Sequence, residues 1–156
     1  MKELLEKYKK QIAEKIQCES KDIFFSDEFG NTEINDLYYY KPSGGNPRGF
    51  SVLQQIDGKK HIISTFKTYE MPHCCAIMIS CNVEVKEKYR NKGIGTILNK
   101  FRQEIGKLLG YSLLLCTDIE QNIHQRKLLK NNGWKDVYNI VNKRTNNKVF
   151  ISVIEL

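Results

Sequence analysis

The sequence lacks the patterns that identify membrane and secreted proteins. No run among its 156 residues approaches the ~20 consecutive apolar residues of a transmembrane helix. Residues 1–7 alternate lysine and glutamate with leucine, and they lack the apolar centre of a secretory signal. We therefore expect no membrane association, and we expect a cytoplasmic protein.

The cysteines do not form the pattern of a disulfide framework or of a zinc site. There are five of them: Cys18, Cys74, Cys75, Cys81 and Cys116. An odd number, an adjacent pair and the lack of an export signal argue against structural disulfides. Neither Cys-x-x-Cys nor His-x₃-His spacing occurs. His73, beside Cys74 and Cys75, could form one corner of a metal site, but we favour buried small residues and expect no metal.

The balance of charge is basic. Lysine and arginine number 25 against 18 acidic residues, for a net charge of +7. This charge indicates an anionic partner. Nucleic acid, an acidic protein and a polyphosphate cofactor are all consistent with it. Because no helix-turn-helix, RNP or zinc-finger signature is present, nucleic acid is the least favoured of these. The densest positive run covers residues 86–92.

With 40% hydrophobic residues, the chain fits one domain, residues 1–156, with a substantial core. Residues 2–17 predict an amphipathic helix that packs against the domain, with a partner-binding helix as the alternative. Its apolar stripe consists of Leu4, Leu5, Tyr8, Ile12 and Ile16. Residues 20–35 predict irregular structure with one short strand.

Three consecutive tyrosines, Tyr38, Tyr39 and Tyr40, are followed by a loop at residues 41–49 that is rich in glycine and proline. The tyrosines could line a substrate cleft or stack on bases. We favour a third interpretation, the edge of a strand, because tyrosine is common in strands.

The rest of the chain alternates strands and helices. Residues 50–56 and 61–68 predict a hairpin around Asp57-Gly58, and residues 74–85 predict a central strand. Further elements are expected as a helix at 93–109, a buried strand at 111–117, a helix at 121–131 and a closing hairpin at 137–142 and 148–154. Strand, helix, strand around residues 74–117 forms a βαβ unit with parallel strands. The fold class is therefore α/β (α+β) with a mixed sheet.

A glycine-rich turn joins the central strand to the long helix. It contains Arg90, Asn91, Lys92, Gly93, Ile94, Gly95 and Thr96. Backbone N–H groups and the helix dipole at such a turn bind phosphate. The turn is not a Walker A loop, which needs lysine and then serine or threonine after its second glycine, and Leu98 occupies the place of the third glycine of a dinucleotide fingerprint.

The turn and its flanks resemble the GCN5-related N-acetyltransferase (GNAT) family. Arg-x-x-Gly-x-Gly resembles the family's pyrophosphate motif, and Val83, Glu84 and Val85 precede it as in the family's fourth strand. Asn122, Leu128 and Gly133-Trp134 match the family's spacing after the fifth strand. The resemblance covers residues 49–155, whereas residues 1–48 diverge from the family's usual opening.

The resemblance implies a GNAT fold and an N-acyltransferase that moves an acetyl group from acetyl-CoA to an amine by direct attack in a ternary complex. The strand residues Val83, Glu84 and Val85 would hold the pantetheine arm, residues 90–96 the pyrophosphate, and Asn122 the region near the sulfur. The amine acceptor, a small molecule or a protein amine, is not predicted, and neither is the oligomeric state.

The resemblance also raises candidates for proton transfer. Glu84 is the first candidate for the general base and His124 the second. The tyrosine that usually protonates the leaving thiolate in the family corresponds to Leu129 here, and Tyr138 or Tyr111 could substitute for it. Cys81 and Cys116 are possible nucleophiles, but buried thiols are the interpretation we favour. Leu129 leaves open a non-catalytic acyl-CoA sensor or protein-binding module.

Overall fold

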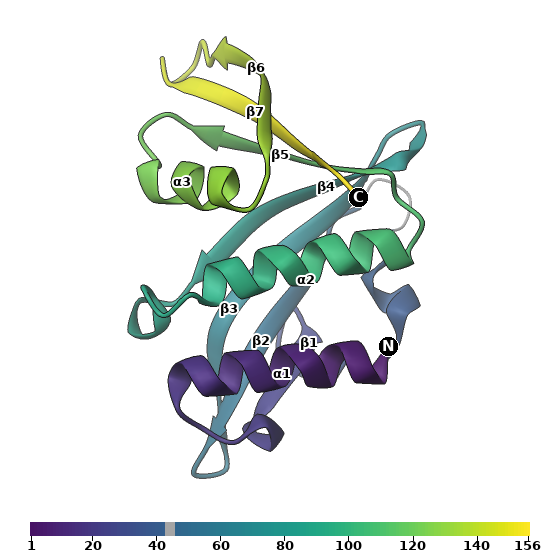
Figure 1. The fold of residues 1–156 in the computed structure, drawn as a ribbon, viewed down its shortest axis with the longest axis vertical. Helices are drawn as coiled ribbons and strands as arrows, with labels where there is room; N and C mark the ends of the chain where they lie inside the picture. Colours follow the sequence, from purple (N-terminus) through teal and green to yellow (C-terminus); the bar gives the residue numbers. More distant parts are fainter. Residues whose placement is uncertain (43–45) are drawn as a thin grey trace.

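A seven-stranded mixed sheet forms the centre of the protein, in the order β1-β2-β3-β4-β5-β7-β6 (Figure 1). The computed structural model describes residues 1–42 and 46–156. The strands are β1 (Ile23–Asp27), β2 (Arg48–Ile56), β3 (Lys59–Met71), β4 (Cys74–Val85), β5 (Leu113–Ile119), β6 (Lys135–Val141) and β7 (Lys148–Glu155). Neighbouring strands are antiparallel except β4 and β5, which are parallel. The predicted mixed sheet with a βαβ unit and a closing hairpin is confirmed.

The turn between β2 and β3 follows from its sequence. Asp57 has φ 49° and Gly58 has φ 74°. Two successive residues with positive φ match the right-handed twist of the flanking strands, and aspartate followed by glycine is a favoured pair for this conformation. The predicted hairpin is therefore confirmed, with strands longer than expected because the pairing begins at Lys59 and extends to Arg48.

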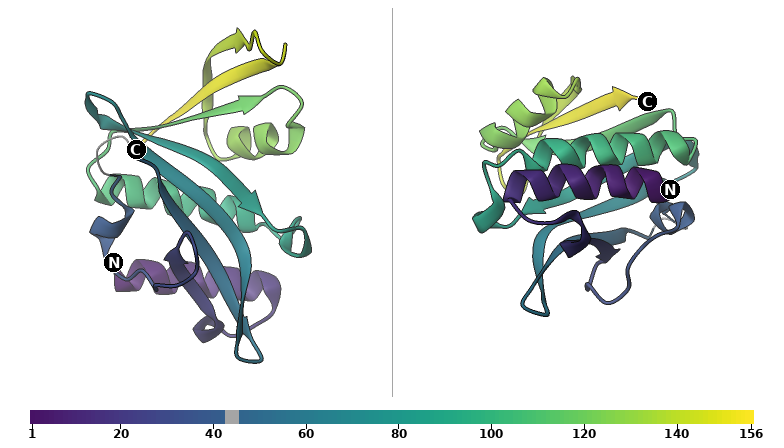
Figure 2. Two further views of the ribbon diagram at one scale, coloured as in Figure 1. Left: turned by 180° about the vertical axis from the view of Figure 1, so that it is seen from behind. Right: turned by 60° about the horizontal axis from the view of Figure 1, so that its bottom comes forward.

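Helices α1 (Lys2–Ile16) and α2 (Ile94–Leu108) lie side by side across one face of the sheet (Figures 1 and 2). The buried residues of α1 are spaced three, four or one apart, as expected for one face of a helix: Leu5, Tyr8, Lys9, Ile12 and Ala13. Burial of this stripe confirms that α1 packs against the domain. The third helix, α3 (Ile123–Asn131), lies beside β5 and β7 (Figure 1).

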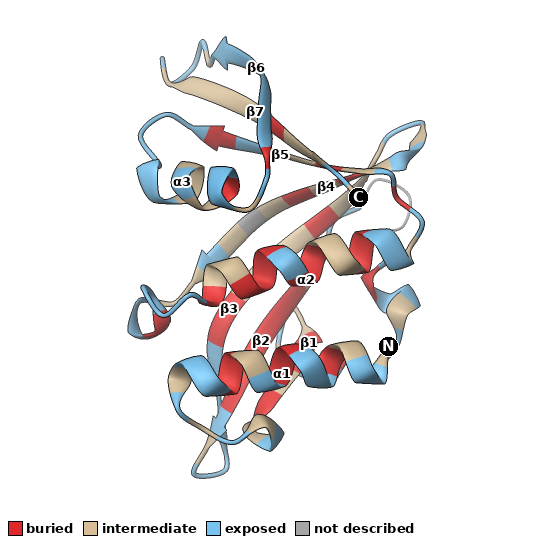
Figure 3. Ribbon diagram, viewed as in Figure 1, coloured by how far each residue is buried: buried red, intermediate tan, exposed pale blue. Residues whose placement is uncertain are grey.

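The ring of Phe101 in α2 forms the centre of the larger core. Tyr8 from α1 and Phe25 from β1 contact it with ring centroids 5.1 and 4.7 Å away. Tyr40 and Phe66 approach it edge-on at 5.6 and 6.2 Å. Figure 3 shows that buried residues recur along α1, α2 and the strands that these helices cover.

The prediction of a strand edge at the three tyrosines is wrong. Residues Leu37–Tyr40 form a 3₁₀ helix, because the Asp36 carboxylate accepts a hydrogen bond from the Tyr38 N–H at 2.9 Å and caps the turn. Tyr40 is 1% exposed and stacks on Phe50, whereas Tyr38 is 74% exposed. The loop predicted at 41–49 lies partly outside the described residues, and β2 begins within it.

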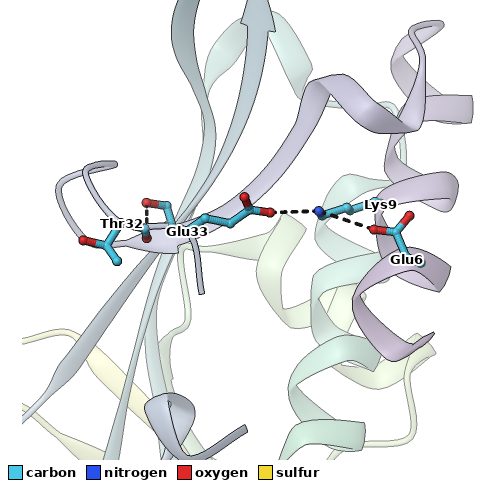
Figure 4. Close-up of polar contacts among 5 residues, drawn as sticks. Glu6, Lys9, Thr32 and Glu33 are labelled. Carbon is cyan, nitrogen blue, oxygen red and sulfur yellow. Dashed lines mark hydrogen bonds and ion pairs between the residues drawn. The ribbon is translucent and has the colours of Figure 1, made fainter. Parts of the chain in front are cut away.

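Ionic contacts attach the irregular segment after β1 to α1 (Figure 4). Lys9 Nζ lies 3.0 Å from Glu33 Oε1 and 3.4 Å from Glu6 Oε1. The Ser26 hydroxyl donates to the Thr32 carbonyl at 2.7 Å, which closes the turn between them. Within residues 20–35, the predicted short strand is confirmed as β1.

Candidate functional site

Strands β4 and β5 separate after three paired residues. Ile77–Ile79 pair with Leu113–Leu115, and the rest of β4 has no partner on β5 (Figure 1). Between the pairs Thr65–Glu84 and Lys67–Cys81, β4 contains one residue more than β3. Such a bulge redirects backbone groups and often lies beside a functional site. The end of β4, with Val83, Glu84 and Val85, therefore presents an open backbone edge.

The first turn of α2 faces the same opening. Gly93 begins the helix with φ 81°, and no side chain caps it. The first N–H that bonds within the helix is that of Ile97, which donates to the Gly93 carbonyl at 3.2 Å. The N–H groups of Ile94, Gly95 and Thr96 are therefore available to an anion, and the helix dipole favours a negative charge there.

The side chain of Arg90 stabilises this turn through a hydrogen bond to the backbone. Its Nε donates to the Val85 carbonyl at 2.9 Å, which joins the turn to the end of β4. The preceding 3₁₀ helix, Glu87–Tyr89, places Tyr89 in the core with its hydroxyl donating to Gln54 at 2.9 Å. The side chain of Arg90 is otherwise exposed and can still reach an anion.

A cleft of about 630 Å³ connects the open edge of β4, the turn and the start of α3. From the predicted set it brings together Val83, Glu84, Val85, Arg90, Asn91, Gly95, Asn122 and His124. Lys92 and Gly93 line a neighbouring hollow of about 530 Å³ instead, together with Lys15 of α1. Sequence reasoning missed Lys15, because nothing in the sequence shows that the end of α1 meets this turn.

An inner cavity of about 170 Å³ lies between the separated strands. It is lined by Ser80, Cys81, Val83, Arg102, Cys116, Thr117, Asp118, Asn122, Gln125, Leu129 and Trp134. Four of these residues, Val83, Arg102, Asn122 and Gln125, also line the cleft, so the two spaces adjoin. The open cleft thus adjoins a small polar cavity inside the fold.

This arrangement of strands and helices matches solved structures. An IAA acetyltransferase from Bacillus cereus matches with a TM-score of 0.57 and 19% identity over 70% of this chain and 78% of that chain. An acetyltransferase of the GNAT family from Streptococcus pneumoniae matches with a TM-score of 0.58 and 16% identity, over 73% of this chain and 69% of that chain. Mutant forms of the spermidine/spermine N-acetyltransferase SpeG from Vibrio cholerae match with a TM-score of 0.57 and 15% identity, over 72% of this chain and 69% of that chain.

The chain has the GNAT acetyltransferase fold. No model of a protein family matches its sequence, and no curated protein does. The likeness is therefore one of structure, and it confirms the fold that the Gly-x-Gly turn and its flanks predicted.

The proton-transfer candidates named from the GNAT resemblance lie in different surroundings. Glu84 lines the cleft, but Lys86 Nζ contacts its carboxylate at 2.8 Å and lowers its pKa. His124 also lines the cleft and is exposed. Tyr138 is 63% exposed on β6 and borders neither the cleft nor the inner cavity. Tyr111 borders neither, and its hydroxyl donates to Glu70 at 3.4 Å.

The residues of the GNAT spacing after β5 form the wall opposite α2. Asn122 caps α3, where its side-chain oxygen accepts from the Gln125 N–H at 3.4 Å. Leu129 is 4% exposed and lies on the inner cavity beside Trp134. The indole N–H of Trp134 donates to Asn99 of α2 at 3.1 Å, which connects this wall to the long helix.

Asp118 is a carboxylate that sequence reasoning missed. It lies on β5, is 8% exposed, and borders the inner cavity. Its Oδ1 accepts from the Ile119 N–H at 3.0 Å, while its buried Oδ2 has no hydrogen-bond partner in the part of the chain that the structure describes. Burial raises the pKa of Asp118, so this carboxylate holds a proton more tightly than an ordinary aspartate.

Burial also determines the state of the two thiols in the inner cavity. It raises the pKa of Cys116 to about 12 and that of Cys81 above its usual value. Since the thiolate is the nucleophilic form, neither residue is activated for attack. Among the described residues, no group of three or more histidine, cysteine or acidic side chains could hold a metal ion. Within residues 1–42 and 46–156, no helix is long and apolar enough to cross a membrane.

Proposed function

We propose that the protein is an N-acyltransferase that transfers an acyl group from coenzyme A, as in acetyl-CoA, to an amine. The observation that carries this proposal is one cleft bordered by the unpaired edge of β4, the N-terminus of α2 and Asn122. The edge of β4 suits the amide arm, the N-terminus of α2 suits the pyrophosphate, and Asn122 suits the sulfur end of the thioester.

The backbone of Val83 to Val85 would pair with the pantetheine amides as an added strand does. The free N–H groups of Ile94, Gly95 and Thr96 would bind the pyrophosphate, with Asn91 and Arg90 beside them. Lys92 and Lys15, on the adjoining hollow, add positive charge where the nucleotide's phosphates would emerge. Asn122 would hydrogen-bond the arm near its sulfur.

Acyl transfer then needs two proton movements. The amine nitrogen forms a bond to the thioester carbonyl carbon, the carbon–sulfur bond breaks, and the sulfur leaves as a thiolate that takes up a proton. The attacking ammonium must first lose a proton. An N–H at the β4 bulge would stabilise the negative charge that develops on the carbonyl oxygen.

Asp118 is the best-placed proton acceptor for the ammonium. It borders the inner cavity that adjoins the cleft, and a carboxylate with a raised pKa is a stronger base than an ordinary one. Glu84, held by Lys86, and the exposed His124 are weaker candidates for the base. Tyr138 remains a candidate for protonating the thiolate only if β6 moves toward the cleft.

One observation favours a second function. Leu129 places an apolar side chain on the cavity wall where the family's tyrosine would donate a proton to the leaving thiolate. A protein that binds acyl-CoA without transferring the acyl group, as a sensor or a protein-binding module, has no need of that donor.

Calorimetric titration with coenzyme A and acetyl-CoA tests the binding step. Thr96→Glu would place a carboxylate at the third position of α2, which favours the helix but repels pyrophosphate. We expect ~10- to 100-fold weaker binding, the value of one or two charge-assisted hydrogen bonds. Asn139→Glu adds the same charge on exposed β6 and should change nothing.

Failure of the wild-type protein to bind either ligand at ~1 mM, where the binding free energy is only about −4 kcal/mol, would refute the proposal. Thiol release in the presence of a panel of amines then tests catalysis. Tight binding without release from any amine would instead support the sensor.

A further inference from the structure

The inner cavity contains a buried positive charge with no negative partner. Arg102, on the inward face of α2, is 3% exposed. Its Nε donates to the Leu98 carbonyl at 3.2 Å, and its Nη1 donates to the Ser80 hydroxyl. No carboxylate among the described residues forms an ion pair with it, including Asp118 on the same cavity.

The side chains nearest the guanidinium do not neutralise it. The titratable groups that act on it electrostatically are Cys116 and Cys81, and both are neutral thiols because burial raises the pKa of each. Burial lowers the pKa of Arg102 only to about 10, so the guanidinium stays protonated at neutral pH. A full positive charge is thus held in the interior by neutral acceptors alone.

An unpaired buried charge is costly, and proteins usually supply a counter-ion or bind one. A guanidinium is a planar fork of donors that matches a carboxylate in two-point geometry. The other lining residues around Arg102 are uncharged apart from Asp118. The place beside Arg102 therefore suits an incoming carboxylate that brings its own negative charge.

The position of Arg102 shows which part of a ligand would meet it. Arg102 lines both the cleft and the inner cavity, and so does Val83 at the proposed thioester site. If a pantetheine arm lay along Val83 to Val85, its sulfur would lie where the cleft meets the inner cavity. The acyl group attached to the sulfur would then enter the cavity. The cavity's volume of about 170 Å³ is several times the ~30 Å³ of one water, which leaves room for a short chain beyond the carbonyl.

We propose that the acyl group transferred by this protein ends in a carboxylate, as in the malonyl and succinyl thioesters of coenzyme A, and that Arg102 and Ser80 bind that carboxylate. This inference rests on the proposed function and names the acyl donor more closely. The distal carboxylate takes no part in the bond changes: the amine still displaces the thiolate at the other end of the chain.

Binding measurements on the wild-type protein give the first test. Malonyl-CoA and butyryl-CoA have acyl chains of similar size that differ in the terminal charge, and succinyl-CoA and valeryl-CoA form a second such pair. We expect each charged thioester to bind ~10- to 100-fold more tightly than its neutral partner, as one charge-assisted pair would give. Coenzyme A itself is included to show that the nucleotide and pantetheine sites are intact.

Substitution of Arg102 gives the second test. Arg102→Leu should abolish the preference for the charged thioester in both pairs, and Arg102→Lys should retain part of it while losing the two-point geometry. Lys100→Leu removes a positive charge from the exposed side of the same helix and should leave the preference unchanged. Circular dichroism verifies that each variant is folded.

The outcomes separate this inference from the proposed function. Equal binding of charged and neutral thioesters, with coenzyme A bound normally, would overturn the role of Arg102 and leave acyltransfer standing. Absence of binding by coenzyme A and every thioester would overturn both. If Arg102→Leu does not fold, the comparison of wild-type affinities within each pair still decides the question.

Discussion

Gly95 in the first turn of α2 lies directly beneath the side chain of Leu128 in α3: a Cβ on Gly95 would be 2.8 Å from Leu128 Cδ1. Both residues line the cleft, so this contact sets the width between its two walls. The glycine is needed here for close approach, because even a methyl group would have to displace Leu128.

We expect Gly95→Ala to destabilise the protein by about 1–3 kcal/mol, the usual cost of inserting a methyl group into a packed site. The double variant Gly95→Ala/Leu128→Ala should recover part of that loss relative to Leu128→Ala alone, because the methyl group then enters free space. Chemical denaturation of the three variants and the wild type measures both effects. Additive changes in the free energy of unfolding would contradict the contact.

Two buried tyrosines should respond in opposite ways to loss of their hydroxyl. The Tyr40 hydroxyl is buried without a hydrogen-bond partner in the described part of the chain, whereas that of Tyr8 donates to Glu104 at 2.8 Å. Tyr40→Phe should therefore leave the melting temperature unchanged or raise it, and Tyr8→Phe should cost about 1 kcal/mol. Thermal unfolding of both variants measures this difference, and a larger loss for Tyr40→Phe would refute it.

The rate of acyl transfer should depend on the protonation of Asp118. A general base acts only when deprotonated, so the rate should fall as pH decreases through its pKa. Because burial raises that pKa, the fall should be centred above the ~3.9 of an ordinary aspartate. Asp118→Asn should lower the rate by ~10²–10⁴ and remove this acidic limb.

Glu84→Gln is the control for this prediction. Lys86 lowers the pKa of Glu84, so replacement of the Glu84 carboxylate should leave the acidic limb of the pH–rate profile in place. Disappearance of the limb in Glu84→Gln, with the limb retained in Asp118→Asn, would transfer the role of base to Glu84. Rates of thiol release over a pH series with one amine provide the measurement.

The cysteines should differ strongly in reactivity. Cys75 is exposed on β4, whereas Cys116 is 6% exposed and its pKa is raised to about 12 by burial. Brief alkylation of the native protein at pH 8 should therefore label Cys75 and spare Cys116. Mass spectrometry of peptides locates the label, and unfolding in urea should make both residues reactive. Rapid native labelling of Cys116 would contradict its burial.

Much of the fold follows from local patterns in the sequence. The apolar run at 74–85, the helical periodicity after Gly93 and the second apolar run from Tyr111 are strong signals, and the structure contains β4, α2 and β5 at those places. The Asp57-Gly58 pair likewise specifies its hairpin turn. These elements were predictable because each has its own pattern over a short stretch.

The errors and omissions have a physical cause that local patterns do not reveal. The tyrosines have high strand propensity, but the Asp36 cap and the packing of Tyr40 on Phe50 favour a 3₁₀ turn. Arg102 and Asp118 line one cavity between the separated strands β4 and β5, although they are far apart in the sequence. One signal for Arg102 was present: it lies one helical turn after Leu98, on the side of α2 that also carries Ile105 and faces the core.

The pairing of α1 with α2 has a consequence for the order of folding during synthesis. The Tyr8–Glu104 hydrogen bond joins residues 96 positions apart, and the ring of Tyr8 packs on Phe101 of α2, so this part of the α1 stripe is covered only after α2 has been made. Contacts between distant segments form slowly, because a long loop must close first. Until α2 follows, the nascent chain exposes part of the apolar face of α1, a surface that chaperones can bind.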